Sequence, residues 1–392
     1  MGRYFKEIKN DFKLKHLTNY LLVLGILAVG VVMLLTGSLR LSVATLFTQI
    51  GFSIILAVSL NLVVGFLGEL SLGHAGFMCV GAYIGGLFAL KISEVIPSKL
   101  AVLVMSMLVG GLVATFFGFI IGLPSLRLKG DYLAIVTLAF GEIVRNIFKN
   151  QKVFGGAMGL NTSSIKYDTR KAPLLFIVTF VVAFLMILLV QNLIRSKHGR
   201  AVTAIRDNEI AAKSMGINVA FYKLFIFMLS AFFAGVAGVI YSHYASPVIY
   251  TFFSYNYSIE ILVMVVLGGM GSITGSIVSA VLIPVINYVL MSNVPPEFAA
   301  IRYLIYALVL IFIIIFGNAP ALKNFREKYS PKALITGRRS SSVNPAKRTD
   351  DEAVWHRIPT KIKMDALLST DLTTDYKYNG STDDGQSGGN EK

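Results

Sequence analysis

Apolar segments long enough to cross a lipid bilayer recur along most of this 392-residue chain. A transmembrane helix needs about 20 consecutive apolar residues. The sequence therefore predicts an all-α, polytopic helical integral membrane protein with about ten transmembrane or partly membrane-embedded helices, some of them broken by glycine-rich segments. The apolar segments lie near residues 18–36, 43–67, 74–90, 99–123, 131–148, 173–194, 221–244, 257–270, 274–291 and 299–317, and those at 74–90, 131–148 and 257–270 are short or polar enough to be partial spans.

The composition agrees with this fold class. Only 15% of the residues are charged, against about 25% in an ordinary soluble protein, while 55% are hydrophobic and the mean hydropathy is +0.69. The single cysteine, Cys79, excludes an internal disulfide framework. The net charge of +15 lies mostly beside apolar segments, where it sets orientation and meets anionic lipid. No compact basic domain is present, so binding to nucleic acid is not expected.

The distribution of Lys and Arg predicts the organisation of the chain. If both termini are cytoplasmic, the basic clusters within 195–220 and after residue 318 fall on the cytoplasmic side, although the basic residues of 149–172 do not. The first apolar run, near 18–36, is long for a cleaved signal and is expected to be a retained helix. We therefore divide the chain into a basic cytoplasmic N-terminus (1–17), a membrane domain (18–317) and a flexible cytoplasmic tail (318–392).

The stretch from Asn61 to Gly86 contains seven glycines and few polar residues. Glycines permit close backbone approach and broken helices, and Gly81 and Gly85 share one helix face on which a neighbouring helix can pack. Polar side chains here should face protein or water rather than lipid. The stretch is either a broken element that lines a pathway or a tight turn between helices. The polar candidates and one glycine among them are Asn61, Glu69, Ser71, Gly73 and His74.

The second stretch, residues 195–220, is a long polar loop between apolar segments. Helical spacing relates Ala204, Asn208, Ala211 and Met215, and Ile205 and Ala212 widen this face of small residues. A short helix with such a face suits docking into a groove of another protein. A solvated surface loop is the alternative.

The ends of this helix can be predicted from its residues. Thr203 or Asp207 is the expected N-cap, Glu209 and Lys213 form a favourable pair four residues apart, and Gly216 is the expected stop. His198 has no second ligand nearby, so we expect no metal site.

The third stretch, 260–275, combines Glu260 with Gly268, Gly269, Gly271 and Gly275. Its Gly-Gly-x-Gly run is not a nucleotide fingerprint, because no strand–turn–helix unit surrounds it. No phosphate-binding Gly-x-x-x-x-Gly-Lys-Ser/Thr sequence occurs, and no catalytic constellation is evident. The chain is therefore not expected to be an enzyme or to hold its own nucleotide. Glu260 is either a helix-packing acid or a pathway residue.

These stretches resemble the permease subunits of branched-chain amino acid ABC transporters, specifically the LivM type. The resemblance covers roughly residues 40–318 and rests on motifs in the expected order. It departs at Phe316-Gly-Asn-Ala-Pro320, where an Arg-Pro-containing sequence is usual, and in the long tail. The matching pieces are Ser59-Leu-Asn-Leu-Val-Val-Gly65, Gly68-Glu-Leu-Ser-Leu-Gly-His-Ala-Gly-Phe77, Leu128-Lys-Gly-Asp-Tyr-Leu-Ala-Ile-Val-Thr-Leu138, Gly199-Arg-Ala201 with Ala204-Ile-Arg-Asp-Asn-Glu209 and Ala211-Ala212, and Leu267-Gly-Gly-Met-Gly-Ser272.

The resemblance implies an importer of branched-chain or related hydrophobic amino acids in a bacterial or archaeal cytoplasmic membrane. Its implied partners are a second, LivH-like permease, two ABC ATPase subunits that hydrolyse the ATP, and an extracytoplasmic substrate-binding protein, with no cofactor on this chain. By matching motif, coupling to the ATPase falls to Gly199, Arg200, Ala201, Ala204, Ile205, Arg206, Asp207, Asn208, Glu209, Ala211, Ala212 and Gly216. The candidate translocation pathway comprises Asn61, Glu69, Ser71, Gly73, His74, Glu260, Gly268 and Gly269.

Three other functions stay open. Related permeases carry urea, amides or other amino acids. An ion-coupled secondary carrier is the main alternative of another class, because Glu69, Glu142 and Glu260 lie in apolar surroundings. A membrane scaffold or receptor without transport is the third.

Overall fold

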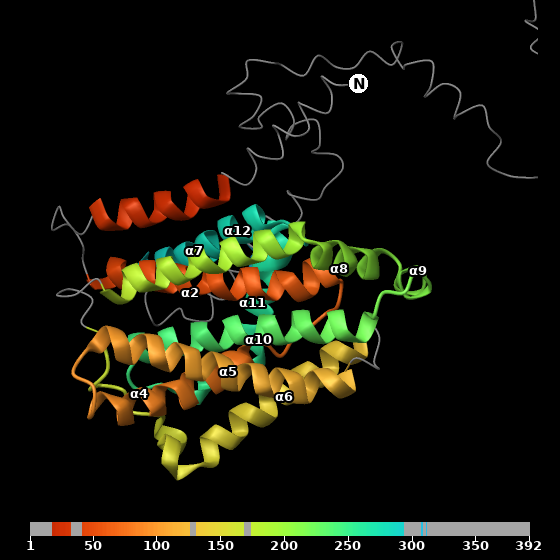
Figure 1. Cartoon of the computed structure of the whole chain (residues 1–392). Coiled ribbons are helices and arrows are strands. Elements are labelled where there is room, and N and C mark those ends of the chain that lie inside the picture. Colours follow the sequence, from red (N-terminus) through yellow and green to blue (C-terminus); the bar gives the residue numbers. More distant parts are fainter. Residues whose placement is uncertain are drawn as a thin grey trace, which may run out of the picture. The chain divides into compact units, whose positions relative to one another are not determined.

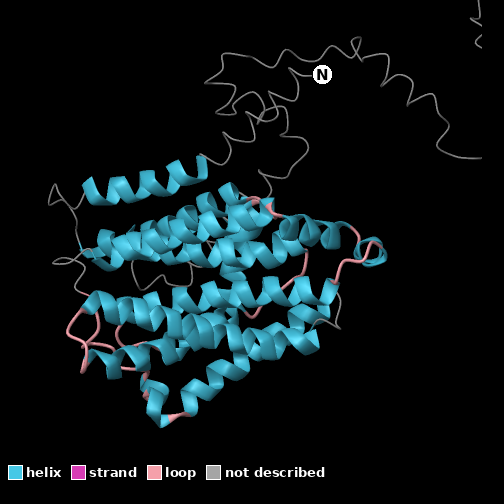
Figure 2. Cartoon of the chain, viewed as in Figure 1, coloured by secondary structure: helices cyan, strands magenta, loops and turns pink. Residues whose placement is uncertain are grey.

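A computed structural model of the chain describes residues 18–32, 41–125, 131–167 and 174–293, together with 307–308 and 311. The chain divides into two units, Met1–Asn318 and Ala319–Lys392, and the second lies outside the described residues. The expected N-terminal segment 1–17 and tail 318–392 therefore lie outside the described residues, as does most of the apolar segment 299–317. The described part of the first unit is a bundle of helices (Figures 1 and 2).

The long helices follow the apolar segments closely. After a first helix, Thr18–Val32, the long elements are α2 (Leu41–Asn61), α5 (Lys99–Ser125), α6 (Asp131–Asn150), α7 (Leu174–Arg195), α10 (Val219–Tyr244), α11 (Tyr255–Gly268) and α12 (Ile273–Asn293). The shorter ones are α3 (His74–Val80), α4 (Gly86–Ser93), α8 (Lys197–Asp207) and α9 (Glu209–Ser214).

Six helical segments in the described part of the chain are long and apolar enough to cross a membrane. The segment near 74–90, expected to be a partial span, is one of them, because α3 and α4 join through a π-helical turn (η2, Gly81–Gly85) and continue to Ser93. The other two expected partial spans are not among the six: α6 carries Glu142, Arg145 and Lys149 within about two turns, and α11 has 14 residues. The six segments are Val43–Leu67, His74–Ser93, Lys99–Leu123, Leu174–Arg195, Val219–Tyr244 and Ile273–Leu290.

Glycines set how closely α10 packs in the bundle. A Cβ added at Gly81 would lie 2.1 Å from the carbonyl oxygen of Gly235 on α10, and one at Gly85 would lie 2.4 Å from the side chain of Val239. The Gly81/Gly85 face therefore meets a neighbouring helix, as its spacing predicts. Only glycine fits at Gly81 without displacing backbone.

The chain breaks between α2 and α3. Helix α2 passes into a π-helical segment, η1 (Leu62–Leu67), which ends at Gly68 in the left-handed conformation (φ +82°). We call residues 68–73, which lead to the start of α3, the break loop. The second break lies between α11 and α12, where Gly269 and Gly271 both have positive φ. Positive φ is strained for other residues, so these glycines make both breaks possible.

The two ends of the bundle differ in what they carry. Helices α8 and α9 project at one end, on the right in Figure 1, and α4 with its adjoining loops lies at the other. Because α10 runs from one end to the other, its residues near Val219 belong to the α8–α9 end and those near Tyr244 to the opposite end. We refer to these as the α8–α9 end and the α4 end.

Candidate functional site

The polar loop 195–220 folds into two short helices rather than one. Ser196 caps α8 by accepting from the backbone N–H of Gly199, and Asn208 caps α9 by accepting from that of Ala211. The expected caps, Thr203 and Asp207, are therefore wrong: both lie within α8. Asn208 adopts an extended backbone (φ −158°) that separates the helices, since its side chain competes successfully for the orphan N–H groups of α9.

The expected stop of this loop is confirmed, but the expected face is divided. Gly216 follows α9 with φ +81°. Ile205 and Ala212 are buried in the core and Ala204 packs against it, so these three do not face outward. The outward side of α9 carries Ala211 and two large apolar residues, Ile210 and Met215, which are 76% and 82% exposed. Both side chains lie outside the candidate membrane spans.

All twelve residues implied in coupling lie on or between these helices. Gly199, Arg200, Ala201, Ala204, Ile205, Arg206 and Asp207 belong to α8, Asn208 joins the helices, Glu209, Ala211 and Ala212 belong to α9, and Gly216 follows it.

Arg206 connects the loop to the membrane-embedded part of the chain. Its Nη1 donates to the carbonyl oxygen of Gly65 in η1 at 3.1 Å, across 141 residues of sequence. Its Nε and Nη2 donate to Asp207 at 3.0 and 2.9 Å. The aliphatic part of Arg206 lies against Gly68, where an added Cβ would come within 2.7 Å of its Cγ. The side chain of Arg206 thus contacts η1 and the break loop. The sequence analysis named Arg206 only as a coupling residue.

The two glycine-rich breaks meet at Asn61. Its Oδ1 accepts from the N–H of Gly271 at 2.9 Å, and its Nδ2 donates to the Ser272 carbonyl at 3.2 Å and the Ser276 hydroxyl at 2.9 Å. Gly65 lies directly beside this contact, because an added Cβ there would be 2.2 Å from the nitrogen of Gly271. The amide of Asn61 thus joins the end of α2 to the second break and the start of α12.

The break loop and the start of α3 are held by side chains from three other helices. Thr137 of α6 accepts from the N–H of Leu72 at 3.0 Å, and Ser258 of α11 accepts from that of Ala75 at 3.1 Å. His74 Nε2 lies 2.7 Å from the hydroxyl of Ser59 on α2. These contacts place the start of α3 inside the bundle, where the break loop would have unpaired backbone groups without them.

Two members of the pathway set stand out within the break loop. Ser71 is buried, and its hydroxyl has no hydrogen-bond partner among the described residues. Gly73 lies against α6, where an added Cβ would be 2.4 Å from the carbonyl oxygen of Thr137. A buried polar atom without a partner is rare in proteins, which singles out Ser71 as a group that a bound molecule could satisfy.

Glu69 is paired with a residue that the sequence analysis overlooked. Lys223, on the first turns of α10, lies 2.6 Å from Glu69 of the break loop and 3.2 Å from Glu209 of α9. Glu209 therefore pairs with Lys223 and not with the expected Lys213. The missed signal was a single lysine inside a long apolar helix, a position that demands a charged partner.

The structure separates the remaining acids. Glu260 accepts a hydrogen bond from Asn287 of α12 at 3.0 Å, about two turns of α11 before Gly268 and Gly269, which form the second break. Glu142 pairs with Arg145 and also accepts from the N–H of Tyr255. Within the described ranges, no three His, Cys, Asp or Glu residues gather into a group that could hold a metal ion.

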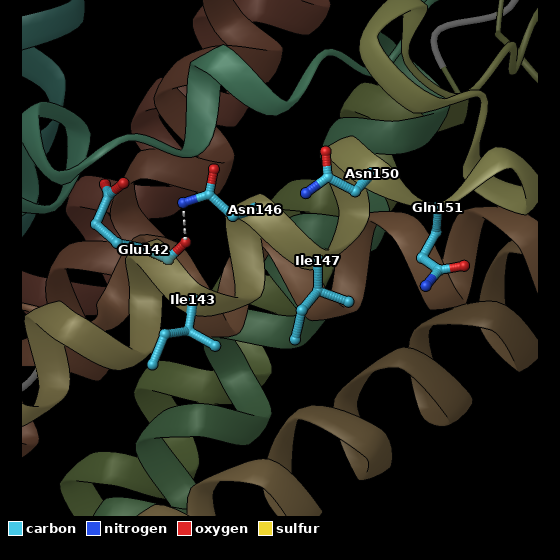
Figure 3. Close-up of a pocket in the computed structure, with 6 residues that line it drawn as sticks. All are labelled: Glu142, Ile143, Asn146, Ile147, Asn150 and Gln151. Atoms are coloured by element: carbon cyan, nitrogen blue, oxygen red, sulfur yellow. Dashed lines mark hydrogen bonds between the residues drawn. The ribbon is translucent and has the colours of Figure 1, made fainter.

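Two cavities lie away from the breaks. One is an open groove of about 480 Å³ along α6, with Ile143 and Ile147 beside the polar Asn146 and Asn150 (Figure 3). The other, of about 240 Å³, lies at the α4 end and is lined in part by Tyr167 and His243. Neither includes a residue of the candidate pathway.

Comparison with known proteins identifies the family. A family model described as branched-chain amino acid transport system, permease component, matches residues 42–314. The chain belongs to this family.

Three relatives of the same kind are similar over long ranges. The chain is 36% identical over 267 residues to the high-affinity branched-chain amino acid transport system permease protein LivM of Salmonella typhimurium. The same protein of Escherichia coli has the same identity over the same length. Both alignments cover 59% of this chain and 60% of the relative. It is 28% identical over 306 residues to the "Probable branched-chain amino acid transport permease protein LivM" of Methanocaldococcus jannaschii, 67% of this chain and 88% of that protein. The chain thus spans about three fifths of the length of the two bacterial relatives.

A relative of the second permease type also matches. The "Probable branched-chain amino acid transport permease protein LivH" of Methanocaldococcus jannaschii is 30% identical over 145 residues, 37% of this chain and 45% of that protein. No solved structure matches the chain.

Proposed function

We propose that this chain is a permease subunit of an ABC importer that moves branched-chain or related hydrophobic amino acids across a bacterial or archaeal cytoplasmic membrane. The family match and the names of the relatives support the transport role. The chain binds no cofactor in this proposal, and partner ATPase subunits hydrolyse the ATP.

The contact between Arg206 and Gly65 carries the proposal. It joins the polar loop at the α8–α9 end to η1, which in turn touches the second break at Gly271. A displacement of α8 and α9 is therefore transmitted directly to both glycine-rich breaks, where the chain is least regular. Coupling of this kind requires packed elements that can take two arrangements, which broken helices provide.

The outward side of α9 is the proposed docking surface for an ATPase. Ile210, Ala211 and Met215 form a small apolar knob outside the membrane-spanning segments, of a size that enters a groove on a partner. In this arrangement the α8–α9 end is cytoplasmic, and so are both termini. A second, LivH-like permease and an extracytoplasmic substrate-binding protein complete the transporter.

The candidate pathway lies where the break loop enters the bundle. Ser71, Gly73 and His74 are buried beside apolar helices, and Ser71 leaves one hydroxyl unsatisfied. A mostly apolar path with few polar groups accepts a branched side chain weakly, as transport requires, while the binding protein supplies selectivity. The acids that suggested an ion-coupled carrier each have a partner: Lys223, Arg145 and Asn287.

The test is reconstitution of the complete transporter in liposomes with leucine as substrate. Uptake that requires ATP and the ATPase subunits is the expected result. Uptake driven by an ion gradient alone would establish the secondary-carrier alternative instead.

Docking is tested with the Ile210→Ser, Met215→Ser double variant. Because interface anchors commonly contribute about 2 kcal/mol or more, the affinity for the ATPase subunits should fall roughly thirtyfold. The matched control is Val95→Ser, Met158→Ser, which removes two similarly exposed apolar side chains at the α4 end. Undiminished co-purification of the ATPase with the first variant would remove α9 from the interface.

A further inference from the structure

One buried ammonium group connects three segments at the α8–α9 end. Lys223 Nζ lies 2.6 Å from Oε1 of Glu69 in the break loop and 3.2 Å from Oε2 of Glu209 at the start of α9, while Lys223 itself belongs to α10. No other ion pair among the described residues joins α9 to the break loop. Lys223 is therefore the shortest charged link between the docking helix and the candidate pathway.

The position of Lys223 is unfavourable without its two partners. Its side chain is only 6% exposed, and the other residues of the first two turns of α10 carry no acidic group. Burial of a charge is costly unless it is paired and hydrogen-bonded. The two carboxylates meet this requirement, so the arrangement depends on α9 and the break loop staying close to α10.

The two arms of this link are unequal. The Glu69 side chain is 14% exposed, and its oxygen is the nearer of the two, whereas the Glu209 side chain is 37% exposed and farther away. A carboxylate that is in contact with water can exchange an ion pair for hydration at little cost, and a buried one cannot. The ion pair with Glu209 is thus less costly to break than the ion pair with Glu69.

We infer that Lys223 is a positioning residue that couples α9 to the break loop, through a fixed ion pair with Glu69 and a releasable one with Glu209. The inference rests on the proposed function, since it assumes that an ATPase moves α9. When the ion pair between Lys223 and Glu209 breaks, the break loop and Lys223 are no longer bound to α9 and can shift together. When it rebinds, the break loop is returned to the position in which Ser71, Gly73 and His74 are buried.

The first measurement is leucine uptake per ATP hydrolysed by the complete transporter in proteoliposomes. Glu209→Gln keeps the size of the side chain but removes the charge that Lys223 binds, so hydrolysis should continue while uptake per ATP falls about tenfold. Lys213→Met is the matched control, because it removes a charge from the same helix without touching the link. Lys223→Arg retains a cation and should restore most of the uptake that Lys223→Met loses.

The second measurement needs no substrate. Hydrogen exchange of the backbone amides in residues 68–73 should be at least about threefold faster in Glu209→Gln than in the parent complex, and unchanged in Lys213→Met. The Lys223→Met variant also tests whether the subunit folds without this cation. If that variant does not assemble into the transporter, the Glu209→Gln result alone decides whether Lys223 couples α9 to the break loop. Parental uptake per ATP together with parental exchange in Glu209→Gln would overturn the inference.

The two proposals fail in different ways. If the parent transporter does not take up leucine with ATP, the proposed function is wrong, whatever the variants do. In that case the exchange measurement still tests whether Lys223 links α9 to the break loop.

Discussion

The two ends of the bundle differ in how much aromatic packing they contain, although hydrogen bonds join distant segments at both. At the α8–α9 end, single polar side chains join segments far apart in the sequence: Arg206 to Gly65, Asn61 to Gly271, and Lys223 to two acids. At the α4 end, aromatic rings pack on one another around Tyr83. Polar pairs can be made and broken one at a time, whereas a packed aromatic cluster holds together as a unit.

Tyr83 shows how the α4 end is fixed. Its ring stacks on Phe148 with centroids 4.7 Å apart and meets Phe154 and Phe253 edge-on or tilted, at 5.8 and 6.1 Å. Its hydroxyl donates to the carbonyl oxygen of Val248 at 3.0 Å. The cluster ties α3–α4, α6 and the loop before α11 together. The comparison suggests a rigid α4 end and an α8–α9 end that can rearrange.

The largest expected effect is at the rigid end. Tyr83→Ala removes a fully buried aromatic side chain, which should cost about 3–5 kcal/mol of stability, whereas Tyr83→Phe removes only the hydroxyl and should cost about 1 kcal/mol. Thermal unfolding of the purified subunit in detergent measures both. If the α4 end is rigid and takes no part in coupling, the Tyr83→Phe transporter should have the same uptake per ATP as the parent. A Tyr83→Phe variant that is stable but uncoupled would contradict the division.

A smaller effect on stability is expected where the two breaks meet. An added Cβ at Gly65 would lie 1.9 Å from Oδ1 of Asn61 and 2.2 Å from the nitrogen of Gly271, so Gly65→Ala must push η1 away from the second break. Overpacking of this kind costs about 1–3 kcal/mol. Uptake per ATP should fall, unlike with Tyr83→Phe.

The control for Gly65→Ala is Gly25→Ala, on the helix Thr18–Val32, where an added Cβ meets nothing within 4 Å. That variant should match the parent in both unfolding temperature and uptake. Equal results for the two glycine variants would mean that the breaks are not in contact.

The fold was largely predictable from the sequence, because the length and hydropathy of an apolar segment indicate a membrane-spanning helix. The apolar segment near 43–67 corresponds to a candidate span at Val43–Leu67, and that near 221–244 to one at Val219–Tyr244. Glycine clusters also marked the two breaks correctly, since positive φ and close backbone contact need glycine. The extent of the helix after His74 was misjudged because η2 continues it through Gly81–Gly85.

The site could be predicted only in parts. Residue chemistry pointed to Asn61 and Glu69, and the family resemblance pointed to Arg206. Nothing local indicates that Arg206 reaches Gly65 or that Asn61 holds Gly271, because these contacts depend on tertiary packing. The helix caps were wrong because 204–215 was treated as one helix, whereas Asn208 interrupts it. The apolar spacing alone did not separate the exposed Ile210 from the buried Ala212.

The smallest expected effect concerns the α4 end at high pH. Tyr167, in the loop after α6, is buried and donates its hydroxyl to the carbonyl oxygen of Lys99 at 2.7 Å. Burial raises the pKa of Tyr167 from 10.0 to about 12. Since the pKa is higher in the folded than in the unfolded state, the neutral phenol contributes stability that is complete below pH 10.0 and declines as the pH rises through about 12.

Tyr167→Phe lacks this titration, so its unfolding temperature should fall less than that of the parent between pH 9 and pH 11 (each about one unit from the ordinary phenol pKa). Thermal unfolding of the detergent-purified subunit at the two pH values measures the difference. The control is Tyr222→Phe, because Tyr222 is a half-buried residue of α10 at the α8–α9 end, with its hydroxyl 3.2 Å from Nδ1 of His198. An equal loss in parent and Tyr167→Phe would show that this phenol is hydrated in the folded state, and that the α4 end is less closed than its aromatic packing suggests.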